Sequence, residues 1–278
     1  MFFPTLFRLK LGFHTLMIST LSVAALGAAE TNAHRRLLWS DEFDLPNGAS
    51  PDTNKWVFDL GAGGWGNNEL QNYTSRTNNV RIEDGKLVIE AQREAFDGSP
   101  FTSARLKTKG KGAWCHGRIE ARMKIPRTQG IWPAFWMLGT GFPETSWPAC
   151  GEIDIMENIG GDPQTVHGTI HGPGYAGNGG ISGSLKLTGT NAFADDFRVY
   201  AVEWTTNRIE WSVDGKSFFS VTPAQLPKGT TWVYNQPHFI LLNVAVGGNW
   251  PGKPDATTEL PQRLVVDYVR VYAPVDAP

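Results

Sequence analysis

Apolar and polar residues alternate along much of the chain, which is the period of a β-strand with one buried face. The clearest case is the segment 117–125, where Ile119, Ala121, Met123 and Ile125 fall on one face and charged residues on the other. Strand-like segments recur roughly every 10–15 residues, separated by sequences rich in turn residues. No segment predicts a helix longer than a turn or two. The pattern therefore predicts an all-β fold, a β-sandwich or jelly roll.

One predicted strand, residues 152–157, carries three acids and departs from strict alternation. Glu152 and Asp154 point to one face, and the isoleucines at 153 and 155 point to the other. On a regular strand, Glu157 would lie on the isoleucine face. A β-bulge between Asp154 and Glu157 absorbs one residue and returns Glu157 to the acidic face. We therefore predict an irregular strand that gathers all three carboxyl groups.

Three carboxylates on one face repel one another and raise at least one pKa, which a fold tolerates mainly where the strain has a use. With the bulge, Glu152 and Glu157 are about four strand steps apart, roughly 13 Å. Long side chains leaning inward would bring their carboxyl groups to the ~5 Å that retaining glycosidases use. The alternative is an acidic strand edge exposed to water.

Aromatic and polar residues near this strand suggest a surface that binds sugars. Trp132 and Trp136 share a strand face, where they would stack on sugar rings or, alternatively, belong to the core. The Gly-rich segment 61–73 is a candidate sugar-binding loop or an ordinary flexible one. On the predicted strand 165–172, His167, Thr169 and His171 share a face. A histidine there would hydrogen-bond Asp154 or the sugar, unless its role is purely structural.

Composition limits the class of protein. The chain has 278 residues, 11 of them Trp, and a net charge of −2 with no basic tract, which argues against a nucleic-acid partner. No linker or internal repeat divides it.

Residues 1–29 resemble a secretory signal, with a weakly basic start, an apolar stretch and small residues for cleavage. An uncleaved membrane anchor is the alternative. We expect a secreted or periplasmic protein, with residues 30–278 forming a single catalytic domain and no membrane contact after cleavage.

The two cysteines, Cys115 and Cys150, form neither a C-x-x-C pair nor a His cluster, which argues against a metal site built on them. In an oxidising compartment they either form one disulfide or stay free, because the sequence does not give the distance between them.

Several motifs together resemble glycoside hydrolase family 16, in its laminarinase-like endo-1,3-β-glucanase branch. The acidic strand matches the family signature Glu-x-Asp-x-x-Glu in its bulged form. The resemblance extends over roughly residues 37–273 and includes the motifs at 39–43, 65–74, 104–111, 117–124, 132–139 and 267–272. It implies a β-jelly-roll sandwich of two antiparallel sheets with a concave substrate groove.

The resemblance also implies residue roles. Glu152 would be the nucleophile and Glu157 the general acid and base, while Asp154 would maintain their charge states. His171 resembles the assisting histidine of bacterial laminarinase-like members. Asn67, Arg105, Trp132, Trp136 and Trp250 would line the groove, although Arg105 is alternatively a surface ion-pair partner.

No cofactor for catalysis is implied. Many members of the family bind one structural calcium ion, and the matching positions here are Glu42, Gly85 and Asp267, largely through backbone oxygens. The expected function is an endo-acting, retaining hydrolase of β-1,3-glucan, active as a monomer. Alternatives are a mixed-linkage β-1,3-1,4-glucanase, a galactanase, or a non-catalytic β-glucan-binding protein. Members of that last kind typically lose the catalytic carboxylates, which are all present in this chain.

Overall fold

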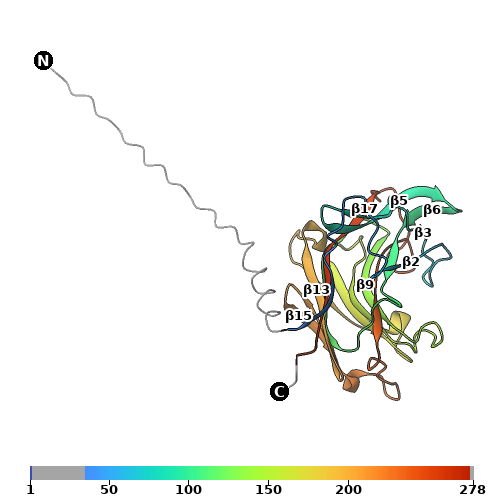
Figure 1. The fold of residues 1–278 in the computed structure, drawn as a ribbon, viewed down its shortest axis with the longest axis vertical. Coiled ribbons are helices and arrows are strands. Elements are labelled where there is room, and N and C mark those ends of the chain that lie inside the picture. Colours follow the sequence, from blue (N-terminus) through green and yellow to red (C-terminus); the bar gives the residue numbers. More distant parts are fainter. Residues whose placement is uncertain (2–34, 276–278) are drawn as a thin grey trace.

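The computed structural model describes residue 1 and residues 35–275, which fold into two β-sheets packed face to face (Figure 1). The predicted signal peptide lies outside the described residues apart from Met1. Among the residues described, no helix is long and apolar enough to cross a membrane. Helical structure in residues 35–275 consists of three 3-10 turns: η1 (Gly177–Gly179), η2 (Phe193–Asp195) and η3 (Pro223–Gln225).

The larger sheet has ten strands within residues 35–275. Its strands run, in spatial order, β15 (Lys216–Val221), β14 (Arg208–Val213), β13 (Arg198–Thr205), β8 (Gly117–Lys124), β17 (Gln262–Tyr272), β5 (Lys86–Phe96), β6 (Ser99–Ser103) and β3 (Gln71–Tyr73). Off this path, β1 (Leu37–Asp41) pairs with β17, and β4 (Val80–Glu83) pairs with β5. All neighbours are antiparallel except β3 and β6.

The second sheet has seven strands in the same part of the chain, all antiparallel to their neighbours. Their order is β12 (Ile181–Lys186), β11 (Thr165–His171), β10 (Glu152–Glu157), β9 (Ile131–Gly139), β16 (His238–Val246), β7 (Arg105–Lys107) and β2 (Val57–Asp59). The predicted acidic strand, β10, lies inside this sheet with a partner on each side.

The core lies between the sheets and follows the alternation of the sequence. Ile119, Ala121 and Met123 of β8 are fully buried, as their shared face predicts. From the opposite sheet, Phe135 and Met137 of β9 pack into the same cluster. Their neighbours in the sequence therefore point to the outer face of the seven-stranded sheet. The predicted two-sheet, antiparallel sandwich is confirmed.

Candidate active site

The acids are gathered by an irregularity in β10. Glu152 pairs with His171 and Asp154 with Thr169 of β11, after which the register shifts and Glu157 pairs with His167. The pairing with β9 shifts in the same place. This is the predicted β-bulge, and it returns Glu157 to the outer face. We call this surface, around Glu152, Asp154 and Glu157, the acidic face.

The bulge is held from behind by the other sheet. The buried indole of Trp211, on β14, donates a hydrogen bond of 2.7 Å to the backbone oxygen of Asp154. Gly168 of β11 leaves room for that ring, since an added Cβ would lie 2.3 Å from Trp211 Cδ1. A bulge interrupts the ladder of backbone hydrogen bonds, and Trp211 supplies a donor where it does so.

His171 lies beside two of the acids, on the neighbouring strand. Its Nε2 is 3.2 Å from Oδ2 of Asp154 and 3.9 Å from Oε1 of Glu152. Asp154 is buried, whereas Glu152 and Glu157 are partly exposed. The structure thus brings the four predicted catalytic residues onto one face, with Asp154 most enclosed.

Each of the two glutamates accepts an indole hydrogen bond. Trp132 Nε1 donates to Oε1 of Glu157 at 3.0 Å, and Trp147 Nε1 donates to Oε2 of Glu152 at 2.7 Å. Trp132 was predicted to bind sugar by stacking, and its N–H has this additional contact. The sequence analysis missed Trp147, because it lies in a loop where no strand period marks its direction.

Burial and mutual repulsion raise the pKa of all three acids. Burial, together with Asp154, raises the pKa of Glu152 to about 8. Burial, together with Glu152, raises the pKa of Glu157 to about 7. Burial and Glu157 raise the pKa of Asp154 well above its ordinary value. The cluster therefore retains protons near neutral pH, which general acid catalysis needs.

Trp136 is fixed by a chain of hydrogen bonds that crosses the sheet. Its Nε1 donates to Oδ1 of Asn243 on β16 at 2.8 Å. Asn243 Nδ2 donates to the Tyr73 hydroxyl, which donates to Oε2 of Glu69, each at 3.2 Å. We call these four residues the Trp136 relay. The sequence analysis included Glu69 and Tyr73 only as part of a candidate sugar-binding loop and did not include Asn243, because these contacts join segments up to 170 residues apart.

Arg105 lies on the same outer face, between two aromatic rings. Its guanidinium carbon is 4.7 Å from the centre of the Trp136 ring and 5.0 Å from that of Trp65. It also forms an ion pair with Asp59, with Nε 3.0 Å from Oδ2. The two interpretations of Arg105 are therefore compatible, since the residue is both ion-paired and next to a predicted sugar-binding ring.

Asn67 and Trp250 border the acidic face on the Trp132 side. Trp250 is 40% exposed and packs edge-on against Trp132, with ring centres 5.6 Å apart, and against His167 at 5.0 Å. The backbone oxygen of Asn67 accepts a hydrogen bond from Asn249, the residue before Trp250. The five predicted substrate-binding residues thus lie in two neighbouring groups joined by β9.

Comparison with known proteins gives the family of the chain. Residues 67–270 match the model of a protein family described as glycosyl hydrolases family 16. The chain belongs to glycoside hydrolase family 16. The predicted family is therefore confirmed.

Three similar proteins of known function illustrate the relation of this chain to other glucanases. A β-glucanase of Rhodothermus marinus is 43% identical over 249 residues, which cover 86% of this chain and 85% of that protein. The laminarinase catalytic domain of Thermotoga maritima superposes with a TM-score of 0.82 at 45% identity, covering 87% of this chain and 99% of that one. A non-specific endo-β-1,3(4)-glucanase, solved with 1,3-β-D-cellobiosyl-glucose at its active site, superposes with a TM-score of 0.77 at 38% identity, covering 86% and 95%.

Two of the three predicted calcium residues of this family member, Glu42 and Asp267, contact arginines. Arg270 donates two hydrogen bonds to Glu42, at 2.9 and 2.8 Å, and Arg122 contacts Oδ2 of Asp267 at 2.7 Å. Gly85 forms the turn between β4 and β5. The two carboxylates are thus already neutralised, and an ion here would have to be held by backbone oxygens. Calcium stays a prediction.

Cys115 and Cys150 do not form a disulfide with each other. Cys115 is exposed, Cys150 is buried, and both are free thiols. Burial, with some repulsion from Glu152, raises the pKa of Cys150 to about 11. Cys150 thus acts as a small apolar residue just before the catalytic strand, and no disulfide joins the two.

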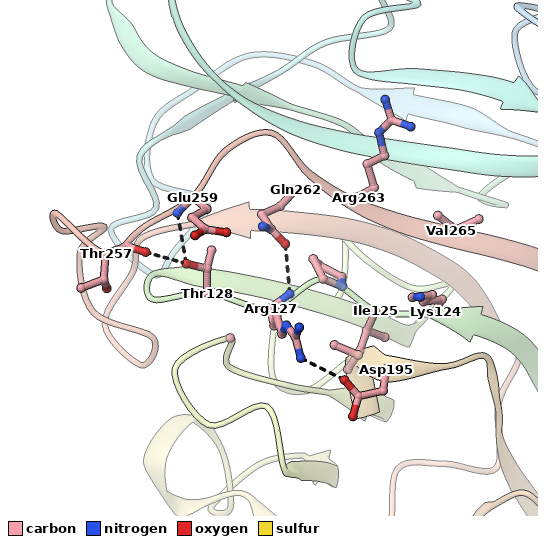
Figure 2. Close-up of a pocket in the computed structure, with 13 residues that line it drawn as sticks. Lys124, Ile125, Arg127, Thr128, Asp195, Thr257, Glu259, Gln262, Arg263 and Val265 are labelled. Carbon is pink, nitrogen blue, oxygen red and sulfur yellow. Dashed lines mark hydrogen bonds and ion pairs between the residues drawn. The ribbon is translucent and has the colours of Figure 1, made fainter. Parts of the chain in front are cut away.

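A cavity of about 730 Å³ lies apart from the acidic face. It is formed where the ends of β8 and β17 meet the turn 126–130 and η2 (Figure 2). Arg127 and Asp195 both line the cavity and form an ion pair at 2.9 Å. None of the predicted site residues lines it. The candidate active site is therefore the acidic face and not this cavity.

Proposed function

We propose that this protein is an endo-acting hydrolase of β-1,3-glucan that works by retaining double displacement. The observation that carries the proposal is the bulge in β10, which places Glu152, Asp154 and Glu157 on one face beside His171. Membership of the family and its laminarinase relatives support the choice of substrate.

In the first step, an oxygen of Glu152 attacks the anomeric carbon as the glycosidic bond breaks. Glu157, whose pKa is raised to about 7, gives its proton to the departing sugar oxygen. The products are a glycosyl ester on Glu152 and a shortened glucan with a new hydroxyl group.

In the second step, Glu157 acts as a base. It takes a proton from a water molecule, whose oxygen attacks the anomeric carbon and releases Glu152 as a carboxylate. Asp154 shares a proton with Glu152, and His171 contacts both carboxylates. The anomeric configuration is inverted twice and so retained overall.

Mixed-linkage β-1,3-1,4-glucan is the second candidate substrate. The endo-β-1,3(4)-glucanase described above carries a cellobiosyl-glucose at its active site and is 38% identical to this chain. A purely glucan-binding role is disfavoured because the complete set of acids, with raised pKa values, has no use in binding alone.

Release of reducing sugar from laminarin, lichenan and agarose tests the substrate. We expect the highest rate on laminarin. A higher rate on lichenan would favour the mixed-linkage alternative, and no release from any of the three would refute the hydrolase proposal.

The anomer of the fresh product tests the mechanism. NMR should detect the β-anomer first, with the α-anomer growing in by mutarotation. An α-anomer formed first would exclude double displacement and the role of Glu152 as nucleophile.

We also propose that the protein is secreted as a monomer after loss of its leader and that a calcium ion stabilises the fold. Mass spectrometry of the mature N-terminus tests cleavage, and light scattering tests the oligomeric state. A melting temperature that stays the same with EDTA and with CaCl₂ would argue against the calcium ion.

A further inference from the structure

Trp147 contacts the proposed nucleophile directly and lies outside the family signature. Its indole N–H reaches Oε2 of Glu152 at 2.7 Å, and its side chain is 42% exposed. The ring centre lies 6.0 Å from that of His171. The ring is therefore exposed at the acidic face while its polar atom is directed at a carboxylate.

The loop that carries Trp147 is anchored on the outer face of the seven-stranded sheet. Cys150 packs in an apolar cluster with Leu138, Phe239 and Leu241, and Phe142 joins this cluster from the edge. Two backbone hydrogen bonds tie the loop together, from Thr145 N to Gly141 O and from Cys150 N to Ser146 O. The chain on both sides of Trp147 is therefore held by packing and by hydrogen bonds, although the ring itself is exposed.

The two oxygens of Glu152 have different neighbours. Oε2 accepts the Trp147 N–H at 2.7 Å, whereas Oε1 is 3.9 Å from His171 Nε2, beyond ordinary hydrogen-bond length. Oε1 is thus the oxygen that the indole does not hold. The titratable groups that interact with Glu152 are Asp154 and Glu157 on its own strand, His171 on β11, Cys150 in the preceding loop and Tyr234 in the core.

We propose that Trp147 is a positioning residue that holds Oε2 of Glu152 and leaves Oε1 to attack the anomeric carbon. This inference rests on the proposed function. During attack, the Oε1–carbon bond forms and the bond to the sugar oxygen breaks, with the proton of Glu157 going to that oxygen. In the resulting ester, Oε2 is the carbonyl oxygen and still accepts the Trp147 N–H.

The hydrogen bond matters most in the second step. When water displaces Glu152, the electron pair of the Oε1–carbon bond returns to the carboxylate, and the donor at Oε2 stabilises the developing charge. In the first step the same donor stabilises a charge that is being lost, so it contributes little there. Loss of the N–H should therefore slow hydrolysis of the ester more than its formation.

The test compares Trp147→Phe, which keeps an aromatic ring but loses the donor, with the wild-type protein. The matched control is Trp39→Phe, the same change on β1 of the other sheet. A dinitrophenyl β-laminaribioside reports both steps through release of dinitrophenol. For Trp147→Phe we expect a burst of dinitrophenol and a steady rate about 10- to 100-fold lower, in the range for a hydrogen bond to a charged group.

The second readout is pH dependence. Without the indole donor, the charged form of Glu152 is less stable, so the acidic limb of kcat/KM should move up by about one pH unit. A ¹³C NMR titration of the glutamate carboxyl groups gives the same information without turnover and serves if the variant is inactive. Trp39→Phe should change neither readout.

The outcomes separate this inference from the proposed function. If wild-type protein hydrolyses laminarin but Trp147→Phe has no burst and an unmoved acidic limb, Trp147 is not a positioning residue. A uniform fall in rate with unchanged pH dependence would also overturn the inference, because it indicates only structural damage. No hydrolysis by wild-type protein would instead refute the proposed function.

Discussion

At the scale of single residues, the acidic face combines groups that oppose one another. Burial and like charge raise the pKa of Glu152 and Glu157, while an indole N–H on each partly offsets this effect. The arrangement keeps a proton in the site near neutral pH. It also costs folding free energy whenever the acids are all ionised.

Because ionisation of the acids costs folding free energy, we predict that substituting Glu157 makes the protein more stable, by an amount that depends on pH. Its pKa is raised from 4.5 to about 7 on folding, so folding favours its protonated form. The stability lost through Glu157 is therefore smallest below about pH 4.5 and grows as pH rises towards 7. Glu157→Gln should be more stable than wild type by about 1–3 kcal/mol at pH 8 and by little at pH 4.5.

Thermal unfolding at the two pH values measures this difference. Glu259→Gln, at an exposed position outside the acidic face, is the control. Equal melting temperatures for Glu157→Gln and wild type at pH 8 would mean that the cluster carries no electrostatic strain.

The proposed general acid also predicts the alkaline limb of activity. Glu157 must be protonated to act, so kcat/KM should fall as pH rises through about 7. Trp132 stabilises the charged form of Glu157, and Trp132→Phe should therefore move this limb to higher pH. A pH–rate profile on laminarin checks both statements, and a limb that moves down would contradict the assignment.

At the scale of elements, β10 shows how far sequence reasoning extends. The parity of Glu157 predicted the bulge, because three acids on one face required one extra residue. The parity of Trp132 and Trp136 likewise predicted their shared face. Trp147 could not be predicted in the same way, since its loop has no period and its direction depends on packing against β9 and β16. The Trp136 relay joins distant strands and leaves no local pattern either.

The Trp136 relay predicts an effect of a residue that lies behind the face. Tyr73→Phe removes the hydroxyl group between Asn243 and Glu69, and so loosens the amide that orients Trp136. If Trp136 binds sugar, KM for laminarin should rise about 3- to 10-fold, the equivalent of one hydrogen bond, with kcat little changed. Initial-rate kinetics test this, and a fall in kcat at constant KM would disagree with a binding role.

At the scale of the whole molecule, the two sheets depend on each other at the site. Trp211 belongs to the ten-stranded sheet, yet it holds the bulge of the seven-stranded one. The two-layer architecture followed from alternation in the sequence. Which core residue would meet the bulge did not, because that depends on how the sheets are aligned across the core. The same holds for Cys115 and Cys150, whose separation only the fold determines.

This link between the sheets predicts that a core substitution lowers activity. Trp211→Phe leaves the backbone oxygen of Asp154 without its indole donor and creates a small void, so it should cost about 2–4 kcal/mol of stability. We also expect slower turnover at temperatures where the variant is folded. Val221→Ala, a core truncation on the neighbouring strand β15, is the comparison. If both variants keep full turnover when folded, the bulge does not depend on Trp211.

Three indole N–H groups, those of Trp132, Trp147 and Trp211, donate to β10. Indole emission responds to the charge of nearby carboxyl groups, and two of these rings touch the acids directly. Tryptophan fluorescence should therefore report the protonation state of these acids. Its ultraviolet fluorescence should change as they titrate and again when a sugar covers Trp147, so that single-tryptophan replacements would separate events that turnover measurements combine.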